Sequence, residues 1–462
     1  MKLQLLIPIV LATAASAVAK TIPNHARANL VLGQPDFVTS TAPLVPGSSN
    51  LSAPTAVIVD PVTGKVFVAD EGNARVLRYP NAASLKNGAG AEAVFGQPSF
   101  SSKTDSSGQQ GLSNGLRGLF LDHKGRLWVG DRDNHRVLCF EAAVHRSSYP
   151  YADRVYGQPD FATTTSGTSS TKMDWPQGVW VDKQDRLWVA DYRNDRVLRF
   201  DDISNKASGS AADGVLGQPD FNSGTSATTP TGMVGPVGVT VSANGTLFVG
   251  TLNRVLRYDD AASLANGSPA DGVLGQPDLT SNTTGLSATF MNSPWGVFLT
   301  PDDTLWVMDS YSNRLLRFDK ASSKPNGAAA DGVVGQPDFV TANSGTDART
   351  FGNGLYYFLS VDSSGNLWAP DYLNNRVLRF PPDVTKPGLV VKSVAKKVTK
   401  KKLKVSGTAS DQYGVSKVQY KLGKGAVKTA SGTISWSFNV KLAEGKNKLT
   451  VWSIDSVGNQ SP

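Results

Sequence analysis

One short motif recurs six times along this chain of 462 residues. Gly-Gln-Pro, followed by Asp or Ser and then by Phe or Leu, begins at Gly33, Gly96, Gly157, Gly217, Gly275 and Gly335, at intervals of 58 to 63 residues. A period of this length is typical of repeat architectures in which each unit is one supersecondary structure. The motif therefore predicts six equivalent units.

Three short apolar segments lie downstream of each motif, bounded by turn residues as strands are. In the third unit they cover residues 176–182, 187–191 and 196–200, and residues 214–217 then lead into the next motif. Each unit thus has four candidate strands. Four strands in each of six units predict an all-β fold, a six-bladed β-propeller.

The order of these segments predicts how the ring closes. The first recognisable strand, residues 29–33, is of the fourth type, whereas the last, residues 376–380, is of the third type. Six complete sheets then require the N-terminal strand to join the last blade. Such closure pairs an edge that would otherwise be free. We expect residues 28–380 to form the propeller.

The segments resemble the NHL repeat, whose units carry a P-x-G-V-x-V-D strand, an L-x-V-A-D strand, an N-x-R loop and an R-V-x-x-F strand. The resemblance covers roughly residues 28–380. The additional Gly-Gln-Pro-Asp-Phe motif is similar to that of a group of exported bacterial NHL proteins of largely unassigned function. The fourth unit departs from the pattern, because residues 250–254 lack the Asp and two residues of the loop.

The N-terminus has the pattern of a secretory signal peptide over residues 1–19: Lys2, an apolar stretch, and small residues ending in Ala17-Val18-Ala19. The mature chain is expected to start near Lys20 and to be secreted, whether extracellular, periplasmic or associated with the cell surface. A retained membrane anchor is the alternative. It is disfavoured because a spanning helix needs about 20 apolar residues and this stretch is shorter.

The chemistry changes after residue 380. Residues 381–386 are predicted to be a linker, and residues 387–462 a small domain. From residue 384 onward the chain has fifteen lysines, no arginine and three acidic residues, a net charge of +12 against +8 for the whole chain. Alternating apolar segments at 403–405, 415–422, 433–440 and 448–454 predict a β-sandwich. Together with residues 405–411 and 455–459, these segments resemble bacterial Ig-like modules.

A lysine cluster opens this domain, at Lys396, Lys397, Lys400, Lys401, Lys402 and Lys404. It can bind an anionic envelope polymer, with an affinity that falls as salt rises. The alternative is a solvated face that keeps the module soluble. A nucleic-acid partner is disfavoured, because aromatic residues that would stack on bases are missing near the cluster.

An Asp and an Arg stand five residues apart in the N-x-R loops of five units. The pairs are Asp70 and Arg75, Asp131 and Arg136, Asp191 and Arg196, Asp309 and Arg314, and Asp371 and Arg376. A carboxylate and a guanidinium that frame a tight loop can satisfy its backbone groups and each other. Five equivalent copies favour this structural role over a catalytic or metal-binding one.

Ligand binding is expected where the units differ, on the rim that carries the inner-strand starts and the N-x-R loops. Arginines and aromatic residues, which dominate binding hot spots, occur there together with one amide. The candidate ligand-binding residues are Arg117, Arg132, Gln177, Tyr192, Arg193, Trp295, Tyr311, Tyr357 and Tyr372. The alternative for Trp295 and Tyr357 is that they fill the channel as core residues.

Catalytic motifs are not apparent. Lyases related to NHL propellers use histidines in the channel, but His25, His123, His135 and His145 have no metal-ligand spacing here. We assign no catalytic residue, metal or cofactor. The expected function is an exported, non-catalytic binding protein of the cell envelope or extracellular space, with a protein, peptide or glycan ligand. The alternative is a propeller lyase or hydrolase with its site at the channel mouth.

Overall fold

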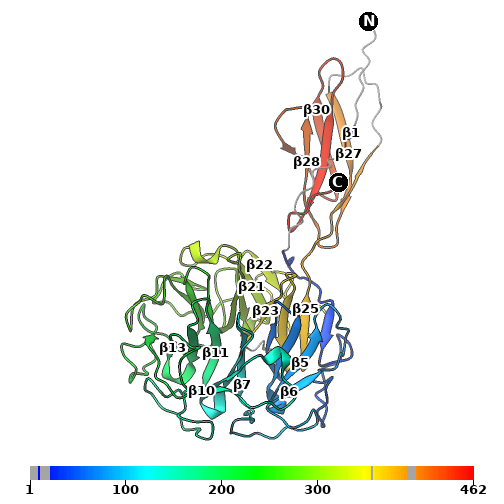
Figure 1. The fold of residues 1–462 in the computed structure, drawn as a ribbon. Coiled ribbons are helices and arrows are strands. Elements are labelled where there is room, and N and C mark those ends of the chain that lie inside the picture. Colours follow the sequence, from blue (N-terminus) through cyan, green and yellow to red (C-terminus); the bar gives the residue numbers. More distant parts are fainter. Residues whose placement is uncertain (1–8, 11–20, 355–356, 393–401) are drawn as a thin grey trace. The chain divides into compact units, whose positions relative to one another are not determined.

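The computed structural model describes residues 9–10, 21–354, 357–392 and 402–462. They form two compact units (Figure 1): Arg27–Pro381, and Pro382–Pro462 together with the N-terminal segment up to Ala26. The expected signal peptide lies outside the described residues except for β1 (Ile9–Val10). None of the helices in the described parts has the length and apolar character that crossing a bilayer requires.

The larger unit consists of six antiparallel four-stranded sheets, the blades of a propeller. Blade I contains β3 (Pro54–Val59), β4 (Lys65–Asp70), β5 (Arg75–Asn81) and β6 (Ala93–Phe95). Blade II contains β7 (Leu116–Leu121), β8 (Leu127–Asp131), β9 (Arg136–Phe140) and β10 (Arg154–Tyr156). Blade III contains β11 (Pro176–Val181), β12 (Leu187–Asp191), β13 (Arg196–Phe200) and β14 (Gly214–Leu216). Blade IV contains β15 (Gly238–Val241), β16 (Leu247–Thr251), β17 (Arg254–Tyr258) and β18 (Gly272–Leu274). Blade V contains β19 (Pro294–Leu299), β20 (Leu305–Asp309), β21 (Arg314–Phe318) and β22 (Gly332–Val334). Blade VI contains β23 (Ser360–Val361), β24 (Leu367–Asp371) and β25 (Arg376–Phe380) together with an N-terminal strand. The six-bladed, all-β prediction is confirmed.

The N-terminal strand closes the ring as predicted. β2 (Leu30–Leu32) pairs antiparallel with β25 and becomes the outer strand of blade VI. Its register places Leu30 opposite Arg379 and Leu32 opposite Val377. All three β2 residues are buried. The last blade is therefore held together by two ends of the propeller sequence, which leaves no free outer edge on β25.

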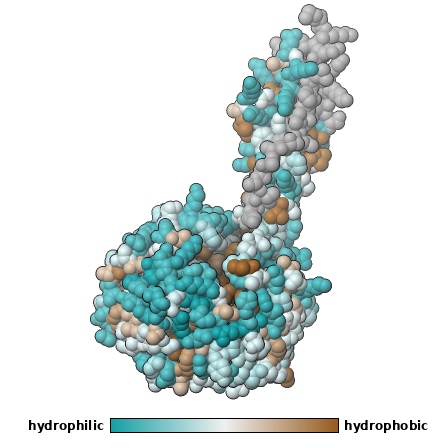
Figure 2. Space-filling view, in the orientation of Figure 1, coloured by the Kyte–Doolittle hydropathy of each residue, from teal (hydrophilic) through white to brown (hydrophobic). Residues whose placement is uncertain are grey.

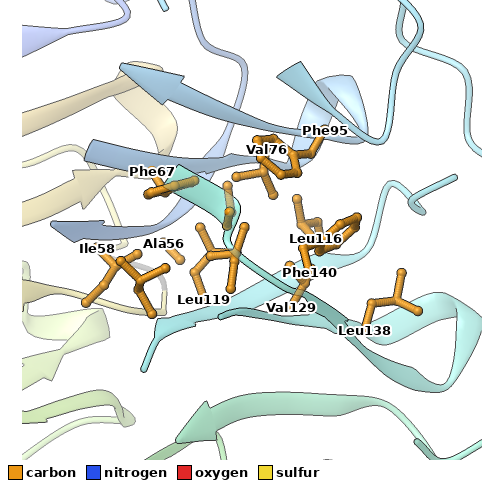
Figure 3. Packing of buried hydrophobic residues seen from close by; sticks show 14 of the residues in the cluster. Ala56, Ile58, Phe67, Val76, Phe95, Leu116, Leu119, Val129, Leu138 and Phe140 are labelled. Carbon is orange, nitrogen blue, oxygen red and sulfur yellow. The ribbon is translucent and has the colours of Figure 1, made fainter. Parts of the chain in front are cut away.

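Apolar side chains from neighbouring blades form the core. Figure 3 shows this packing between blades I and II, where Ala56 and Phe67 face Leu116 and Leu119. The rings of Phe95 and Phe140 meet edge to face, with centroids 5.4 Å apart. Each sheet is covered on both faces by its neighbours, so the strands read as nearly continuous apolar runs.

The N-x-R loops are 3-10 turns fixed by buried ion pairs. In blade III, η4 (Tyr192–Asn194) lies between Asp191 and Arg196, whose Oδ2 and Nε are 2.8 Å apart. Arg196 also donates through Nη2 to the carbonyl oxygens of Ser169 and Lys172. The four other Asp–Arg pairs have Nε–Oδ2 distances of 2.7 to 2.8 Å, and all are fully buried. The structural role of these pairs follows directly from this geometry.

The Gly-Gln-Pro motif connects the outer strand to this loop. Gln218 donates through Nε2 to the carbonyl oxygens of Asp195 and Thr225, at 2.9 and 3.0 Å, and accepts the Thr225 N–H at Oε1. The Asp that follows in the motif, Asp220, accepts the N–H of Asn222. The motif therefore holds the rim loops in place and is not itself a variable surface.

The smaller unit is a sandwich of two sheets. One consists of β26 (Gly388–Val391), β27 (Lys402–Ser410) and β30 (Ser435–Lys441), and the other of β1, β31 (Leu449–Asp455), β28 (Val415–Leu422) and β29 (Lys428–Thr429). Its core includes Trp436 and the stacked rings of Tyr420 and Phe438. Lys402 and Lys404 are exposed on β27, whereas the other four lysines of the predicted cluster lie outside the described residues.

Candidate functional site

The inner-strand starts and the 3-10 turns meet at one end of five blades, and in blade IV a shorter turn joins β16 to β17 at the same end. The register pairs the first residue of the inner strand with the last Asp of the second strand, as in Leu116 with Asp131 and Pro176 with Asp191. Six candidate residues directly follow these positions, Arg193 and Tyr311 lie two residues after Asp191 and Asp309, and Tyr357 precedes β23. They therefore share one rim around the mouth of the channel, as the sequence predicted.

Four candidate aromatic residues form one cluster across blades V and VI. Trp295 stacks on Tyr357, with ring centroids 5.5 Å apart and planes 19° apart, and meets the edge of Tyr311 at 5.5 Å. Tyr357 in turn contacts Tyr372 at 6.4 Å. Tyr311 is 49% exposed, whereas Trp295 and Tyr357 pack partly against the core. We call these four residues the aromatic cluster.

Arg117 supports the aromatic cluster from below. Its guanidinium carbon lies 4.1 Å from the Tyr357 ring centroid, and the guanidinium forms an ion pair with Glu71. Both charged side chains are buried. Desolvation raises the pKa of Glu71, and the nearby Arg117 opposes this shift. Since the charge of Arg117 is already paired inside the protein, this residue positions Tyr357 and is not available to a ligand.

Three further candidates surround a tryptophan that the sequence analysis did not select. The guanidinium carbons of Arg193 and Arg132 lie 3.4 and 4.5 Å from the ring centroid of Trp175. The ring of Tyr192 stacks beside the indole, at 6.3 Å and 29°. We call these four residues the tryptophan–arginine cluster. Cation–π contacts of this kind are each worth about 0.5–2 kcal/mol.

The backbone of Trp175 is left-handed, with φ of 60°. Only small residues occupy the equivalent position of the other five units: Ala53, Gly115, Gly235, Ser293 and Gly354. A bulky residue in this conformation costs about 1–2 kcal/mol. Comparing this position among the repeats would have revealed the exception, because Trp175 is the one large side chain there.

A hydrogen bond from the preceding blade holds this left-handed residue. The Trp175 N–H donates to Nδ1 of His135 at 3.3 Å. In four other blades an Asp or Asn accepts the same bond at the same position: Asp195, Asn253, Asn313 and Asn375. Desolvation lowers the pKa of His135, and Asp174, 3.2 Å from the same nitrogen, opposes this shift. The neutral imidazole therefore accepts at Nδ1.

Of the arginines in the tryptophan–arginine cluster, only Arg132 is paired with an acid. Its Nε lies 2.7 Å from Oδ1 of Asp133. Arg193 is exposed, and no described carboxylate pairs with its guanidinium. Its guanidinium carbon lies over the indole, 3.4 Å from the ring centroid. A guanidinium can bind a carboxylate or sulfate by donating two parallel N–H hydrogen bonds to it.

Side chains fill the channel below the mouth. Phe120 and Trp180 have centroids 4.2 Å apart, and Trp180 meets Phe298 of blade V at 5.8 Å. Nearer the mouth, Phe358 approaches Gly178 so closely that a Cβ there would lie 2.9 Å from its ring. Gln177 is buried at this level, and its Oε1 has no hydrogen-bond partner in the part of the chain that the structure describes. These contacts narrow the channel below the mouth.

The histidines do not come together. His123 lies between β7 and β8, His145 ends η3 (Ala143–His145), and only His135 is at the rim. Within the described part of the propeller, no three His, Cys, Asp or Glu side chains are close enough to share a metal ion. Cys139 is buried, and burial raises the pKa of its thiol well above the usual range.

Comparison with known families identifies the smaller unit. Residues 393–451 match the family model described as a bacterial Ig domain. A stretch of 123 residues is 31% identical to peptidyl-glycine alpha-amidating monooxygenase B of Xenopus laevis, over 26% of this chain. This chain covers only 13% of that relative's length.

Solved structures resemble the propeller at low sequence identity. A streptogramin B lyase aligns with a TM-score of 0.40 and 12% identity, over 74% of this chain and 96% of that one. A structural genomics protein of unknown function from Bacteroides thetaiotaomicron aligns with a TM-score of 0.47 and 14% identity, over 76% of each chain. Identities this low concern the fold alone. The chain thus combines a propeller fold with a C-terminal bacterial Ig domain.

Proposed function

We propose that the protein is an exported, non-catalytic binding protein of the cell envelope or extracellular space, and that its propeller rim binds an acidic glycan. The proposal includes membership of the NHL repeat family, for which the six repeated units are the support. The signal-like N-terminus and the bacterial Ig domain support export.

The contact between Arg193 and Trp175 carries the proposal. A guanidinium stacked on an indole is already ordered, so little conformational entropy is lost when it binds an anion. Arg193 is exposed and has no acidic partner among the described residues. It therefore suits the carboxylate or sulfate of an acidic sugar, while the ring of Tyr192 beside it offers an apolar face.

The aromatic cluster provides a second contact area on the same rim. Trp295 and Tyr311 present flat rings, and Tyr311 is half exposed. Because the channel is filled beneath them, the surface suits a polymer lying across the mouth better than a small molecule enclosed in a pocket. The face of the propeller seen in Figure 2 is largely hydrophilic, with apolar residues scattered over it.

Glycan and peptide arrays probed with the purified full chain test this proposal. Acidic glycans are expected to give the strongest signals, and chelation should not abolish them. In titrations with the best array ligand, Arg193→Ala and Trp295→Ala should each weaken binding about 10-fold or more. The matched controls are Arg27→Ala, an exposed arginine outside the rim, and Tyr151→Ala, an exposed tyrosine in the β9–β10 connection.

Three results would oppose the proposal. Selective binding of peptides, with no acidic glycan bound, would show that the ligand is a peptide and not a glycan. Conversion of the bound ligand to products, detected by mass spectrometry and lost in His135→Asn, would favour the lyase or hydrolase alternative. Retention of full affinity in both rim variants would place the binding surface elsewhere.

A further inference from the structure

Three aspartates converge at one end of the Ig unit. Asp383 lies in the segment before β26, Asp411 in the turn after β27, and Asp455 at the end of β31. One carboxylate oxygen of each residue lies within 4.8 Å of those of the other two. These are three of the few acidic residues in a unit dominated by lysine. Yet none of the three forms an ion pair with a described lysine.

The local backbone fixes the direction of all three side chains. Oδ1 of Asp411 accepts the N–H of Tyr413 at 2.8 Å, and Oδ1 of Asp455 accepts those of Val457 and Asn459 at 3.0 and 2.8 Å. Oδ1 of Asp383 accepts the Thr385 N–H at 3.0 Å in the same way. Each aspartate thus uses one oxygen to cap its own turn and leaves the other oxygen to point elsewhere.

The remaining oxygens of the two buried aspartates have no hydrogen-bond partner among the described residues. Asp383 is 4% exposed and Asp455 is 1% exposed, and Oδ2 of each is buried and unpaired. An unpaired buried charge costs several kcal/mol, and neighbouring carboxylates add repulsion to this cost. Buried charges in proteins are paired or coordinate metals. The protein itself supplies no cation here among the described residues.

We propose that Asp383, Asp411 and Asp455 bind one calcium ion. The donor set is oxygen only, which hard divalent cations prefer and zinc or copper sites rarely use. Calcium–oxygen distances are about 2.3–2.6 Å, so two ligands on opposite sides of one ion are separated by about 5 Å, compatible with the 4.8 Å limit. Magnesium, at about 2.0–2.1 Å, would require a tighter arrangement.

The ion would add a link among three segments that hydrogen bonds already connect in part, such as the bond from the Ser456 N–H to the Gly414 carbonyl oxygen at 3.1 Å. Asn459 already links two of them, since its Nδ2 donates to the Asp383 carbonyl oxygen at 3.0 Å. Calcium would add a bond between the start of the unit, the β27–β28 turn and the C-terminal segment. The sequence analysis assigned no metal, because the three residues are far apart in the chain. This inference does not depend on the ligand of the propeller.

Calcium titration of the purified full chain tests the site. After treatment with EDTA and dialysis, calorimetric titration with CaCl2 should show about one ion bound per chain, with a dissociation constant of roughly 0.1–1 mM or lower. Binding should raise one unfolding transition by about 5–10 °C. MgCl2 should bind at least about 10-fold more weakly. Hydrogen exchange should slow at residues 411–414 and 455–459 when calcium is added.

Asp411→Asn and Asp455→Asn provide the decisive variants, with Glu444→Gln, an exposed acid of the same unit, as the matched control. Each Asp variant should weaken calcium binding about 10-fold or more, whereas the control should bind like the parent. If Asp455→Asn fails to fold, as judged by circular dichroism, calcium binding by the Asp411→Asn variant remains as the test, because Asp411 is partly exposed. Absence of calcium binding at about 10 mM, or unchanged binding in the Asp411 variant, would overturn the proposal.

Discussion

The guanidinium carbon of Arg193 lies 3.4 Å from the ring centroid of Trp175, and the Trp175 backbone is left-handed. The two residues come from the same blade, but the conformation of Trp175 is held by His135 of the blade before it. A strained tryptophan at a position where the other units have small residues indicates a requirement other than folding. The ordered indole surface that results is the most distinctive feature of the rim.

Replacing Trp175 should separate stability from binding. Trp175→Gly removes the left-handed strain of about 1–2 kcal/mol but also the contacts of the indole with both arginines. Since these effects oppose each other, the melting temperature should change by no more than about 2 °C. Calorimetry measures it. A large loss of stability would mean that Trp175 is mainly a core residue.

His135 should make the rim sensitive to acid. Its pKa in the folded protein is lowered from the ordinary value of 6.5. Its contribution to stability is therefore complete above pH 6.5 and is lost as the pH falls below that value towards the folded pKa. Protonation places a hydrogen on Nδ1, which then no longer accepts the Trp175 N–H.

A matched variant tests this pH dependence. Asn accepts the equivalent bond in three blades, so His135→Asn should preserve the structure without titrating. The parent should lose more stability than His135→Asn between pH 7.5 and pH 5, as measured by thermal melting. Parallel pH profiles for the two proteins would contradict the role of the imidazole.

Asp191→Ala should destabilise the propeller strongly. Asp191 and Arg196 are fully buried, so removing the carboxylate leaves a buried guanidinium without its partner, at a cost of about 3–5 kcal/mol. Urea unfolding measures this change. Asp201→Ala is the control, because its carboxylate, paired with Arg199, is 40% exposed and this partly solvated ion pair should contribute less than about 1 kcal/mol. Equal losses of stability in the two variants would contradict the structural role of the buried Asp191–Arg196 pair.

Removing β2 should destabilise blade VI in particular. A chain that begins at Gly33 exposes the backbone of β25, which pairs with Leu30–Leu32 in the intact protein. Hydrogen exchange should accelerate at Leu367–Phe380 more than in blades II to IV. Uniform exchange rates in the truncated and intact proteins would show that ring closure contributes little.

Repetition explains how much of the fold could be predicted. The six copies of the motif determine local geometry, so the blades, the closing strand and the Asp–Arg pairs were predictable from spacing alone. The rim position of the candidate residues followed from the same strand order. Each of these features depends on residues within one unit or at the ends of the ring.

The remaining features depend on contacts that no single unit contains. Phe120, Trp180 and Phe298 fill the channel because three blades meet there, which a linear pattern does not reveal. The pairing of Arg117 with Glu71 likewise joins blades I and II. It removes from the candidate surface an arginine that the sequence had placed there. Trp175 precedes its inner strand by one residue, so it lies outside the strand and loop positions from which the candidate residues come.

The claim that the rim around Trp175 binds the ligand is tested most directly by titrating the strongest array ligand into the parent and Trp175→Gly proteins. The melting temperature of the same samples is measured in parallel. The account predicts that affinity falls about 10-fold or more in the variant, while the melting temperature stays within about 2 °C of the parent value. Unchanged affinity in a variant that remains folded would contradict it.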